Sequence, residues 1–291
     1  MATQSPTIIK IESLKKEYDR LRLGKNSLLE ILDEAEIAES VYNSNAIENS
    51  TLTLKETEKI LLEMEVSRDV SLREVFEAKN LARVIDYIRN KSKEELSINL
   101  ILLLHEMLIL NIKDSIAGRF RQVGEYVRIA NYIAPAPEKV GNLITQTLLD
   151  YTSDLQSFFI DKIAKFHLDF ETVHPFNDGN GRIGRLIINY QLLHLDFPMI
   201  IIRNKEKSTY YQSFNDYHDN KSTKTMERLI SLALLESFHK RITYLKGEKI
   251  IPLVDYAKKE NKPTPVLLNA ARRQTIAAFR EKGIWKIGDK D

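Results

Sequence analysis

The stretch HPFNDGNGRIGR, from His174 to Arg185, gathers within twelve residues the side chains that phosphoryl-transfer chemistry uses. The imidazole of His174 has an ordinary pKa of about 6.5, so it can take a proton from an incoming hydroxyl near neutral pH. Asp178 offers a carboxylate, the hard oxygen ligand that Mg²⁺ prefers. The guanidinium groups of Arg182 and Arg185 can each bind phosphoryl oxygens through two hydrogen bonds. These residue types together predict a phosphoryl-transfer site.

The glycines of the stretch predict how an anion is held there. If a helix begins near Asn180, its first backbone N–H groups have no partner within the helix and point at one spot. Gly179 and Gly181 carry no Cβ, so an anion can approach that backbone closely. On such a helix Arg182 and Arg185 are three residues apart and share a face. We therefore predict an anion-binding turn at the start of a helix.

The same letters also match the dinucleotide-binding pattern G-x-G-x-x-G, from Gly179 to Gly184. That turn needs a buried strand before it, a small residue where Arg182 stands, and an acidic residue about twenty positions later. The preceding segment FIDKIAKFHLDFETV instead has the spacing of an amphipathic helix, and the residues around position 204 read NKEKS. We therefore reject the dinucleotide interpretation.

The elements that must position this stretch are predicted to be mainly α-helical. A capping box, Thr53 to Glu56, opens a helix after a break at Asn49 and Ser50. Residues 118–140 are the exception. β-Branched and aromatic side chains are frequent there, Gly124 lies among them, and two prolines close the segment. We interpret the segment as a short β-hairpin or extended flap.

Composition and charge narrow the class of protein. The 291 residues include no cysteine, which excludes disulfides and thiolate metal sites and fits a reducing compartment. The sequence shows neither an apolar run of membrane-spanning length nor the apolar core of a signal peptide. We therefore expect a cytoplasmic protein with no membrane partner.

The end of the chain differs in character from the rest. From Lys246 onward there are eleven Lys or Arg against six Asp or Glu, a net charge of +5, whereas the remainder has a net charge of −3. Short helical segments separated by turns and followed by IWKIG have the pattern of a winged helix-turn-helix module. A helical packing appendage with a solvated basic face is the alternative for these residues.

The motif HPFNDGNGRIGR resembles the signature of the Fic family of nucleotidyl transferases, His-Pro-Phe-x-(Asp/Glu)-Gly-Asn-Gly-Arg-x-x-Arg, at every specified position. The resemblance extends from about Ile101 to Lys240. It implies a mainly α-helical Fic core with a β-hairpin flap. We accordingly divide the chain into an N-terminal helical region (1–95), a Fic core (96–245, with the flap at about 118–136) and a winged-helix-like module (246–291).

The resemblance also implies an activity, in which AMP passes from ATP to a Ser, Thr or Tyr hydroxyl of a target protein. His174 would take the hydroxyl proton, and Asp178 would hold Mg²⁺ on the α- and β-phosphates. The family pattern places Asn180 and the amides around Gly179 and Gly181 in the anion hole. It further implies that Arg182 binds the β-phosphate, Arg185 the γ-phosphate, and Tyr211 the region near adenine, while Phe176 anchors the loop. His218 stands where some members have Asn, which bears on the choice of base.

Two further features of the family have counterparts here. The segment 118–136 resembles the flap, whose exposed edge can pair with the backbone of a target protein. The residues Ser44 to Asn49 fit the inhibitory pattern (Ser/Thr)-x-x-x-Glu-(Gly/Asn). Ser44 and Glu48 are four apart and share a helical face, and Asn49 can end that helix in the left-handed conformation. The resemblance implies that Glu48 restrains the enzyme, and if Glu48 pairs with Arg185 it would both neutralise and occupy that guanidinium group.

Several alternatives stay open at the level of sequence. Relatives in the family also transfer UMP, phosphocholine or phosphate, and some remove AMP. A second hypothesis is a DNA-binding regulator whose Fic core senses nucleotide, with duplex DNA bound by Arg272, Arg273, Gln274, Arg280 and Lys282. The target protein, the activating signal and the oligomeric state, a homo-oligomer included, are not determined by the sequence.

Overall fold

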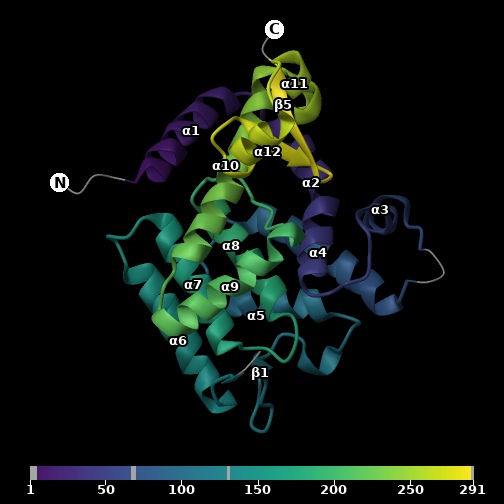
Figure 1. Ribbon diagram of the computed structural model, residues 1–291. Coiled ribbons are helices and arrows are strands. Elements are labelled where there is room, and N and C mark those ends of the chain that lie inside the picture. Colours follow the sequence, from purple (N-terminus) through teal and green to yellow (C-terminus); the bar gives the residue numbers. More distant parts are fainter. Residues whose placement is uncertain (1–4, 67–69, 130–131, 290–291) are drawn as a thin grey trace. The chain divides into compact units, whose positions relative to one another are not determined.

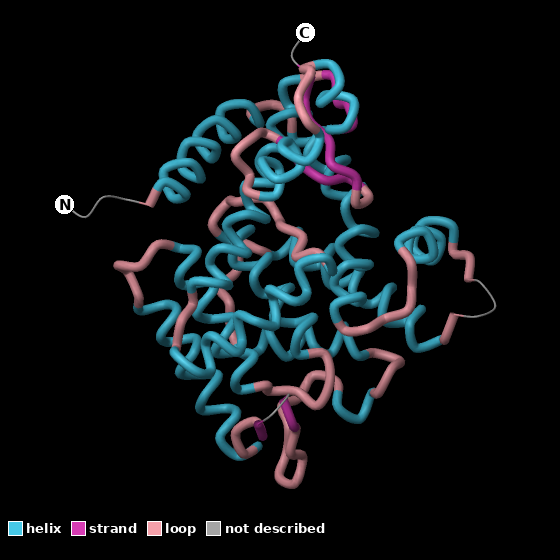
Figure 2. The backbone as a smooth tube through the Cα atoms, in the orientation of Figure 1, coloured by secondary structure: helices cyan, strands magenta, loops and turns pink. Residues whose placement is uncertain are grey.

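The computed structural model describes residues 5–66, 70–129 and 132–289, and the fold of these residues is mainly α-helical (Figures 1 and 2). Strands are confined to a two-stranded hairpin in the middle of the chain and a three-stranded sheet near its end. The predicted mainly α fold with a short hairpin is thus confirmed. Residues 130 and 131 of the predicted flap lie outside the described residues.

Two compact units make up the structure. The first comprises the described residues of Met1–Glu36, Pro198–Ile201 and Ile230–Asp291, and the second comprises Ile37–Phe197 and Ile202–Leu229. Helices α2 (Asn26–Ile47) and α10 (Lys224–Lys246) each contribute residues to both units. The predicted boundaries near residues 95 and 245 do not coincide with these units, and the three-part division stays a prediction.

The second unit holds the motif and is built from helices around α8. Helix α8 packs against α4, α5 and α7, and α7 also packs against α6 and α9 (Figure 1). Besides its share of α2 and α10, the unit contains α3 (Leu54–Glu58), a π-helical turn (Lys59–Glu63), α4 (Leu72–Lys91), α5 (Ile98–Ile109), a 3₁₀ turn (Asp114–Ile116), β1 (Arg128–Ile129), β2 (Tyr132–Ile133), α6 (Pro137–Ser153), α7 (Phe159–Val173), α8 (Asn180–His194), a second 3₁₀ turn (Asn204–Glu206) and α9 (Lys207–Asn220).

Local sequence signals explain where several of these elements begin. Thr53 caps α3 through the predicted capping box, in which its hydroxyl accepts from the backbone N–H of Glu56 and the Glu56 carboxylate accepts from the backbone N–H of Thr53. Helix α7 spans the residues that the apolar spacing predicted. The hairpin pairs Arg128 with Ile133 and Ile129 with Tyr132 in antiparallel register. Sequence patterning therefore located the helices and the hairpin that carry the site.

The first unit contains α1 (Pro6–Arg22) and the C-terminal module. After the last residues of α10 the chain forms β3 (Lys249–Pro252), α11 (Leu253–Lys259), α12 (Thr264–Arg272), β4 (Ala278–Glu281) and β5 (Ile284–Asp289). The three strands are antiparallel in the order β3-β5-β4. Leu253, Ala257, Leu267, Ala271 and Ile287 belong to an apolar core between the helices and this sheet. The winged-helix description of the module stays a prediction, and this element order is compatible with it.

Within the described part of the chain, no helix has both the length and the apolar character needed to cross a lipid bilayer.

Candidate active site

The motif forms the turn between α7 and α8, and two of its residues have a left-handed backbone. His174 ends α7 in the left-handed conformation with a φ of 49°, and Gly179, also left-handed at φ 85°, precedes the first residue of α8. A Cβ on Gly179 would press on the side chains of Leu108 and Ile109 in α5. Helix α8 begins at Asn180, so its first N–H groups face the turn as an anion site requires.

Side chains inside the protein hold the turn in place. Phe176 is fully buried and its ring stacks on that of His105, with centroids 3.7 Å apart and planes 4° from parallel. The Asn180 side chain binds the Phe176 backbone twice, accepting from its N–H at 2.9 Å and donating to its carbonyl at 2.8 Å. The amide of Asn180 is therefore occupied within the loop, which leaves the backbone N–H groups at the start of α8 as the donors for an anion.

His105 also links the turn to the segment before the flap. Its Nδ1 accepts a hydrogen bond from the backbone N–H of Gly118 at 3.1 Å, so Nε2 carries the proton and donates to the backbone carbonyl of Asp178 at 3.1 Å. Burial lowers the pKa of His105 to about 4, so the ring is neutral at physiological pH. The ring is therefore a structural support of the loop.

The flap is attached to the catalytic turn by Arg121, a residue that the sequence analysis did not single out. The guanidinium group is buried and donates to the backbone carbonyls of His174 at 2.8 Å, Val173 at 3.2 Å and Pro135 at 2.9 Å. These bonds fix the start of the motif against the base of the flap. Val173 and His174 lie more than fifty residues along the chain from Arg121, so local sequence spacing could not have revealed this role.

The two arginines of the motif have different surroundings. Arg182 pairs with Asp178 at 3.0 Å and with Glu77 of α4 at 3.2 Å. Asp178 in turn accepts from Arg73 at 2.6 Å, and the side chain of Arg73 is 59% exposed. One carboxylate oxygen of Asp178 therefore contacts Arg182 and the other contacts Arg73, whose side chain is exposed.

Arg185 pairs with the residues of the predicted inhibitory segment. Its Nη2 lies 2.9 Å from the Glu48 carboxylate and donates to the Ser44 carbonyl at 2.9 Å, and its Nε donates to the Ser44 hydroxyl at 3.0 Å. Asn49 follows in the left-handed conformation at φ 68°. The structure thus brings Ser44, Glu48 and Arg185 together. A Cβ on Gly181 would collide with the Glu48 carboxylate, so the glycine also makes room for this pair.

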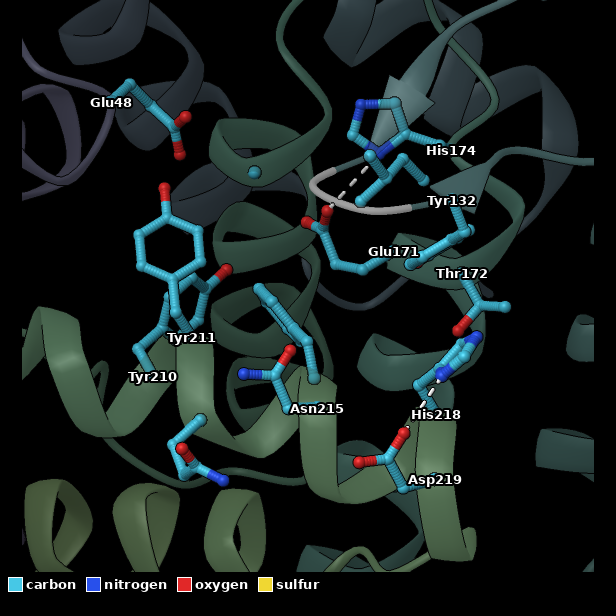
Figure 3. Close-up of a pocket in the computed structure, with 14 residues that line it drawn as sticks. Glu48, Tyr132, Glu171, Thr172, His174, Tyr210, Tyr211, Asn215, His218 and Asp219 are labelled. Atoms are coloured by element: carbon cyan, nitrogen blue, oxygen red, sulfur yellow. Dashed lines mark hydrogen bonds and ion pairs between the residues drawn. The ribbon is translucent and has the colours of Figure 1, made fainter.

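A cavity of about 760 Å³ opens beside these residues, and Figure 3 shows its lining. His174, Gly181, Glu48 and Tyr211 all line it, and the ring of Tyr132 from the flap stacks on that of His218 with centroids 4.9 Å apart. Burial lowers the pKa of His174 to about 4. A neutral imidazole, which is the form that accepts a proton, therefore faces the cavity.

Two buried residues beneath the cavity were missed as site residues. The hydroxyl group of Tyr210 is hydrogen-bonded to Nε2 of His167 at 2.9 Å. It also accepts a hydrogen bond from Arg185 at 3.2 Å, which helps to hold the guanidinium group in place. Glu171, one helical turn before His174, also lines the cavity. A carboxylate on the apolar face of α7 was the signal that could have identified Glu171.

The comparisons with known proteins match this geometry. The family model described as Fic/DOC family matches residues 95–192. The chain is similar to a protein adenylyltransferase Fic from Nematostella vectensis, with 29% identity over 71% of this chain and 49% of that protein. It is also similar to the protein adenylyltransferase fic-1 of Caenorhabditis elegans, with 31% identity over 60% of this chain and 35% of that protein. The chain thus spans less than half the length of these curated relatives.

The fold is also that of a solved structure. A Fic domain containing signaling protein from Bacteroides thetaiotaomicron is 24% identical and covers 82% of this chain and 98% of its own, with a TM-score of 0.74. The helical core therefore has a Fic fold. Residues 95–192 of the chain match the model of the Fic/DOC family.

The C-terminal module corrects part of the predicted DNA-binding set. Gln274 is buried, and its amide bonds His239 at 2.8 Å and the carbonyls of Ala271 and Ala278. Arg280 pairs with Glu236 of α10 at 2.6 Å and lies over the ring of Trp285. Both side chains are engaged within the protein, since Gln274 is buried and the side chain of Arg280 is 12% exposed. They are therefore not placed to contact DNA.

Proposed function

We propose that the chain is an autoinhibited protein adenylyltransferase, which transfers AMP from ATP to a Ser, Thr or Tyr hydroxyl of a target protein. The observation that carries the proposal is that His174 and Gly181, in the first turn of α8, line one cavity. Glu48 lines the same cavity and pairs with Arg185. The printed names of the curated relatives, protein adenylyltransferases, support the same reaction.

In this reaction the hydroxyl oxygen of the target attacks the α-phosphorus of ATP. A P–O bond forms to the target, the bond between the α-phosphorus and the bridging oxygen breaks, and pyrophosphate leaves. His174 takes the hydroxyl proton as a general base, which typically contributes about 10²- to 10⁴-fold in rate. The neutral state of the buried imidazole supports this role.

The phosphates would lie at the start of α8. The backbone N–H groups around Gly179 and Gly181 would bind them, with Arg182 at the β-phosphate and Arg185 at the γ-phosphate. Asn180 would contribute by holding the loop through Phe176, since its side chain is already bonded there. Tyr211 lines the same cavity and would lie against the base.

Asp178 is the residue that would hold Mg²⁺. Among the residues that the structure describes, no cluster of three or more His, Cys, Asp or Glu side chains is placed to bind a metal ion. A single carboxylate nevertheless fits, because Mg²⁺ is commonly held by one or two carboxylates together with substrate phosphates and water. When bound, the ion would neutralise charge on the α- and β-phosphates. Arg73 would have to leave Asp178, and its exposed side chain permits this.

Glu48 would restrain the enzyme by occupying Arg185. The guanidinium group that would bind the γ-phosphate is paired with the Glu48 carboxylate and with Ser44. A phosphate arriving there meets a carboxylate of like charge, so the triphosphate cannot reach the orientation for transfer. The target would bind at the hairpin edge by backbone pairing, which is tolerant of sequence.

The reaction is tested with ATP labelled on the α-phosphate and the full chain carrying Glu48→Gly. We expect label on protein, the chain itself included, and a mass increase of one AMP on a hydroxyl side chain in tandem mass spectrometry. The same chain with an additional His174→Ala substitution is the control and should show no label. Equal labelling of the two chains, or none in either, would refute the proposal.

DNA binding by the C-terminal module is a second candidate function. The helices α11 and α12, the antiparallel sheet and the net positive charge of residues 246–291 favour it, and Arg272 and Arg273 are exposed at the end of α12. Phosphate contacts predict binding that weakens steeply with salt. Fluorescence anisotropy with a labelled duplex should show such binding for the full chain and weaker binding for Arg272→Glu, Arg273→Glu. Binding that is absent, or insensitive to salt, would eliminate this candidate.

A further inference from the structure

The carboxyl group of Glu171 is buried next to the ring of His174. It lies on the last turn of α7, its residue is 8% exposed, and its Oε2 is 3.7 Å from Nδ1 of His174. In Figure 3 the carboxyl group of Glu171 points toward that ring, and a dashed line marks the pair. The other oxygen, Oε1, is buried and has no hydrogen-bond partner among the described residues.

A packing role does not explain a carboxyl group in this position. Burying a carboxyl group without satisfying both oxygens is costly, and an apolar side chain of similar size would avoid that cost. The group is also tightly confined, because a Cβ on Gly184 of α8 would collide with Glu171 Oε1 and with the ring of His167. A polar side chain held so closely, facing a general base, calls for a chemical explanation.

Charged and titratable groups surround Glu171 on several elements. Glu48, just after α2, has like charge, and Arg185 of α8 has opposite charge. The ring of His167 lies on the same helix, and the hydroxyl groups of Tyr210 and Tyr132 come from α9 and the flap. Burial and the like charge of Glu48 raise the pKa of Glu171 to about 8, against the opposing effect of Arg185.

We propose that Glu171 is a positioning residue for His174, whose carboxylate stabilises the imidazolium that forms when His174 takes the proton of the target hydroxyl. This inference rests on the proposed transfer reaction. The distance of 3.7 Å exceeds a hydrogen bond, and Nδ1 of His174 has no hydrogen-bond partner among the described residues, so the carboxylate acts through its charge. In a water-poor site such a charge has a larger effect than in bulk water.

The burial of His174 explains why a negative charge from Glu171 would assist its role as a base. Burial lowers the pKa of the imidazole to about 4, which makes it a weak base at neutral pH. General bases work best when their pKa lies near the operating pH. A negative charge close to Nδ1 favours the protonated ring and moves the pKa of His174 back toward that range.

The proposal predicts a direction of pH dependence. The carboxylate forms as the pH rises through the pKa of Glu171, so transfer should increase with pH through that value. In the wild-type chain this pKa is about 8. In Glu48→Gly the like charge is gone, so the pKa of Glu171 falls and the rise in kcat should occur below pH 8.

The kinetic test compares chains that all carry Glu48→Gly. Glu171→Gln keeps the size of the side chain but cannot ionise, so it should lower kcat about tenfold or more, leave the KM for ATP nearly unchanged, and remove the rise with pH. Asp169→Asn is the matched control, because Asp169 lies on the same helix but bonds Tyr217 and Lys165 outside the cavity. It should keep the parent kcat and pH profile. A Glu171→Gln chain with the parent profile would overturn the proposal.

A second measurement needs neither activity nor a folded Glu171 variant. In the wild-type chain labelled with ¹⁵N-histidine, the ring signals of His174, assigned by their loss in His174→Ala, should show an inflection near pH 8 as Glu171 ionises. No inflection of the His174 signals between pH 6 and 10 would refute the inference, whatever the enzyme assay shows. Failure of Glu48→Gly to label protein would instead refute the transfer reaction.

Discussion

Replacing Glu48 by glycine is the perturbation for which the structure gives the clearest magnitude. The carboxylate lies 2.9 Å from Arg185 Nη2, and the Arg185 side chain is 6% exposed while that of Glu48 is 34% exposed. Two unit charges about 4 Å apart interact by about 4 kcal/mol at an effective dielectric constant of 20. Because solvent reaches the Glu48 end, we reduce this to roughly 1.5–3 kcal/mol, the range of a hydrogen bond to a charged group.

That energy is what a γ-phosphate must overcome to take Arg185 from Glu48. Since each ~1.4 kcal/mol corresponds to a tenfold change, Glu48→Gly should raise transfer by about 10- to 100-fold. Arg185 should stay in place, because its two bonds to Ser44 do not involve the Glu48 side chain. Glu48→Gln, which keeps the shape and removes the charge, should give an intermediate gain.

The assay is the initial rate of AMP incorporation into protein at several ATP concentrations. The gain should disappear in the double variant Glu48→Gly, Arg185→Ala, because the arginine that the first substitution releases is then missing. A single variant no more active than wild type would refute the reasoning, and so would a double variant that keeps the gain. In either case Ser44 to Asn49 would be an ordinary helix end.

Three further substitutions test the site. His174→Ala in a Glu48→Gly chain should lower kcat by about 10²- to 10⁴-fold while the Kd for ATP changes little, since a general base acts in the transition state; a proportional loss of ATP affinity in calorimetry would contradict this. Gly181→Ala in the same background should raise the Kd for ATP at least tenfold, which corresponds to about 1.4 kcal/mol of binding free energy. The reason is that a Cβ would stand where the phosphates approach the backbone of α8, and an unchanged affinity would show that the phosphates bind elsewhere. Asn180→Ala should lower the free energy of unfolding by about 2–4 kcal/mol in urea titrations, because it leaves the buried N–H and carbonyl of Phe176 without partners; a loss below about 0.5 kcal/mol would argue against that role.

The fold and much of the site could be predicted because their signals are local. The spacing of apolar residues in FIDKIAKFHLDFETV and the Thr53 capping box depend on neighbours within one or two helical turns. The same is true of the left-handed position at Asn49. The partition into units was not predictable in this way, because residues 198–201 join a unit otherwise formed by both ends of the chain.

The roles of individual polar side chains could likewise be predicted only where they depend on neighbours close in sequence. From its letters alone the sequence determined that His174, Asp178, Arg182 and Arg185 form one motif at the start of a helix, because a turn and a helix fix residues a few positions apart. Only the tertiary structure decided that Arg121 and His105 hold this motif.

Glu171 and Gln274 show the physical reason most plainly. The spacing along α7 puts Glu171 on the apolar face but does not say what surrounds its carboxyl group, and a glutamine after a helix reads as solvated surface; both residues are buried. Glu171 lies beneath Glu48 and Arg185, and Gln274 bonds His239. Burial and charge environment depend on which elements pack together, and local sequence spacing does not encode those long-range contacts.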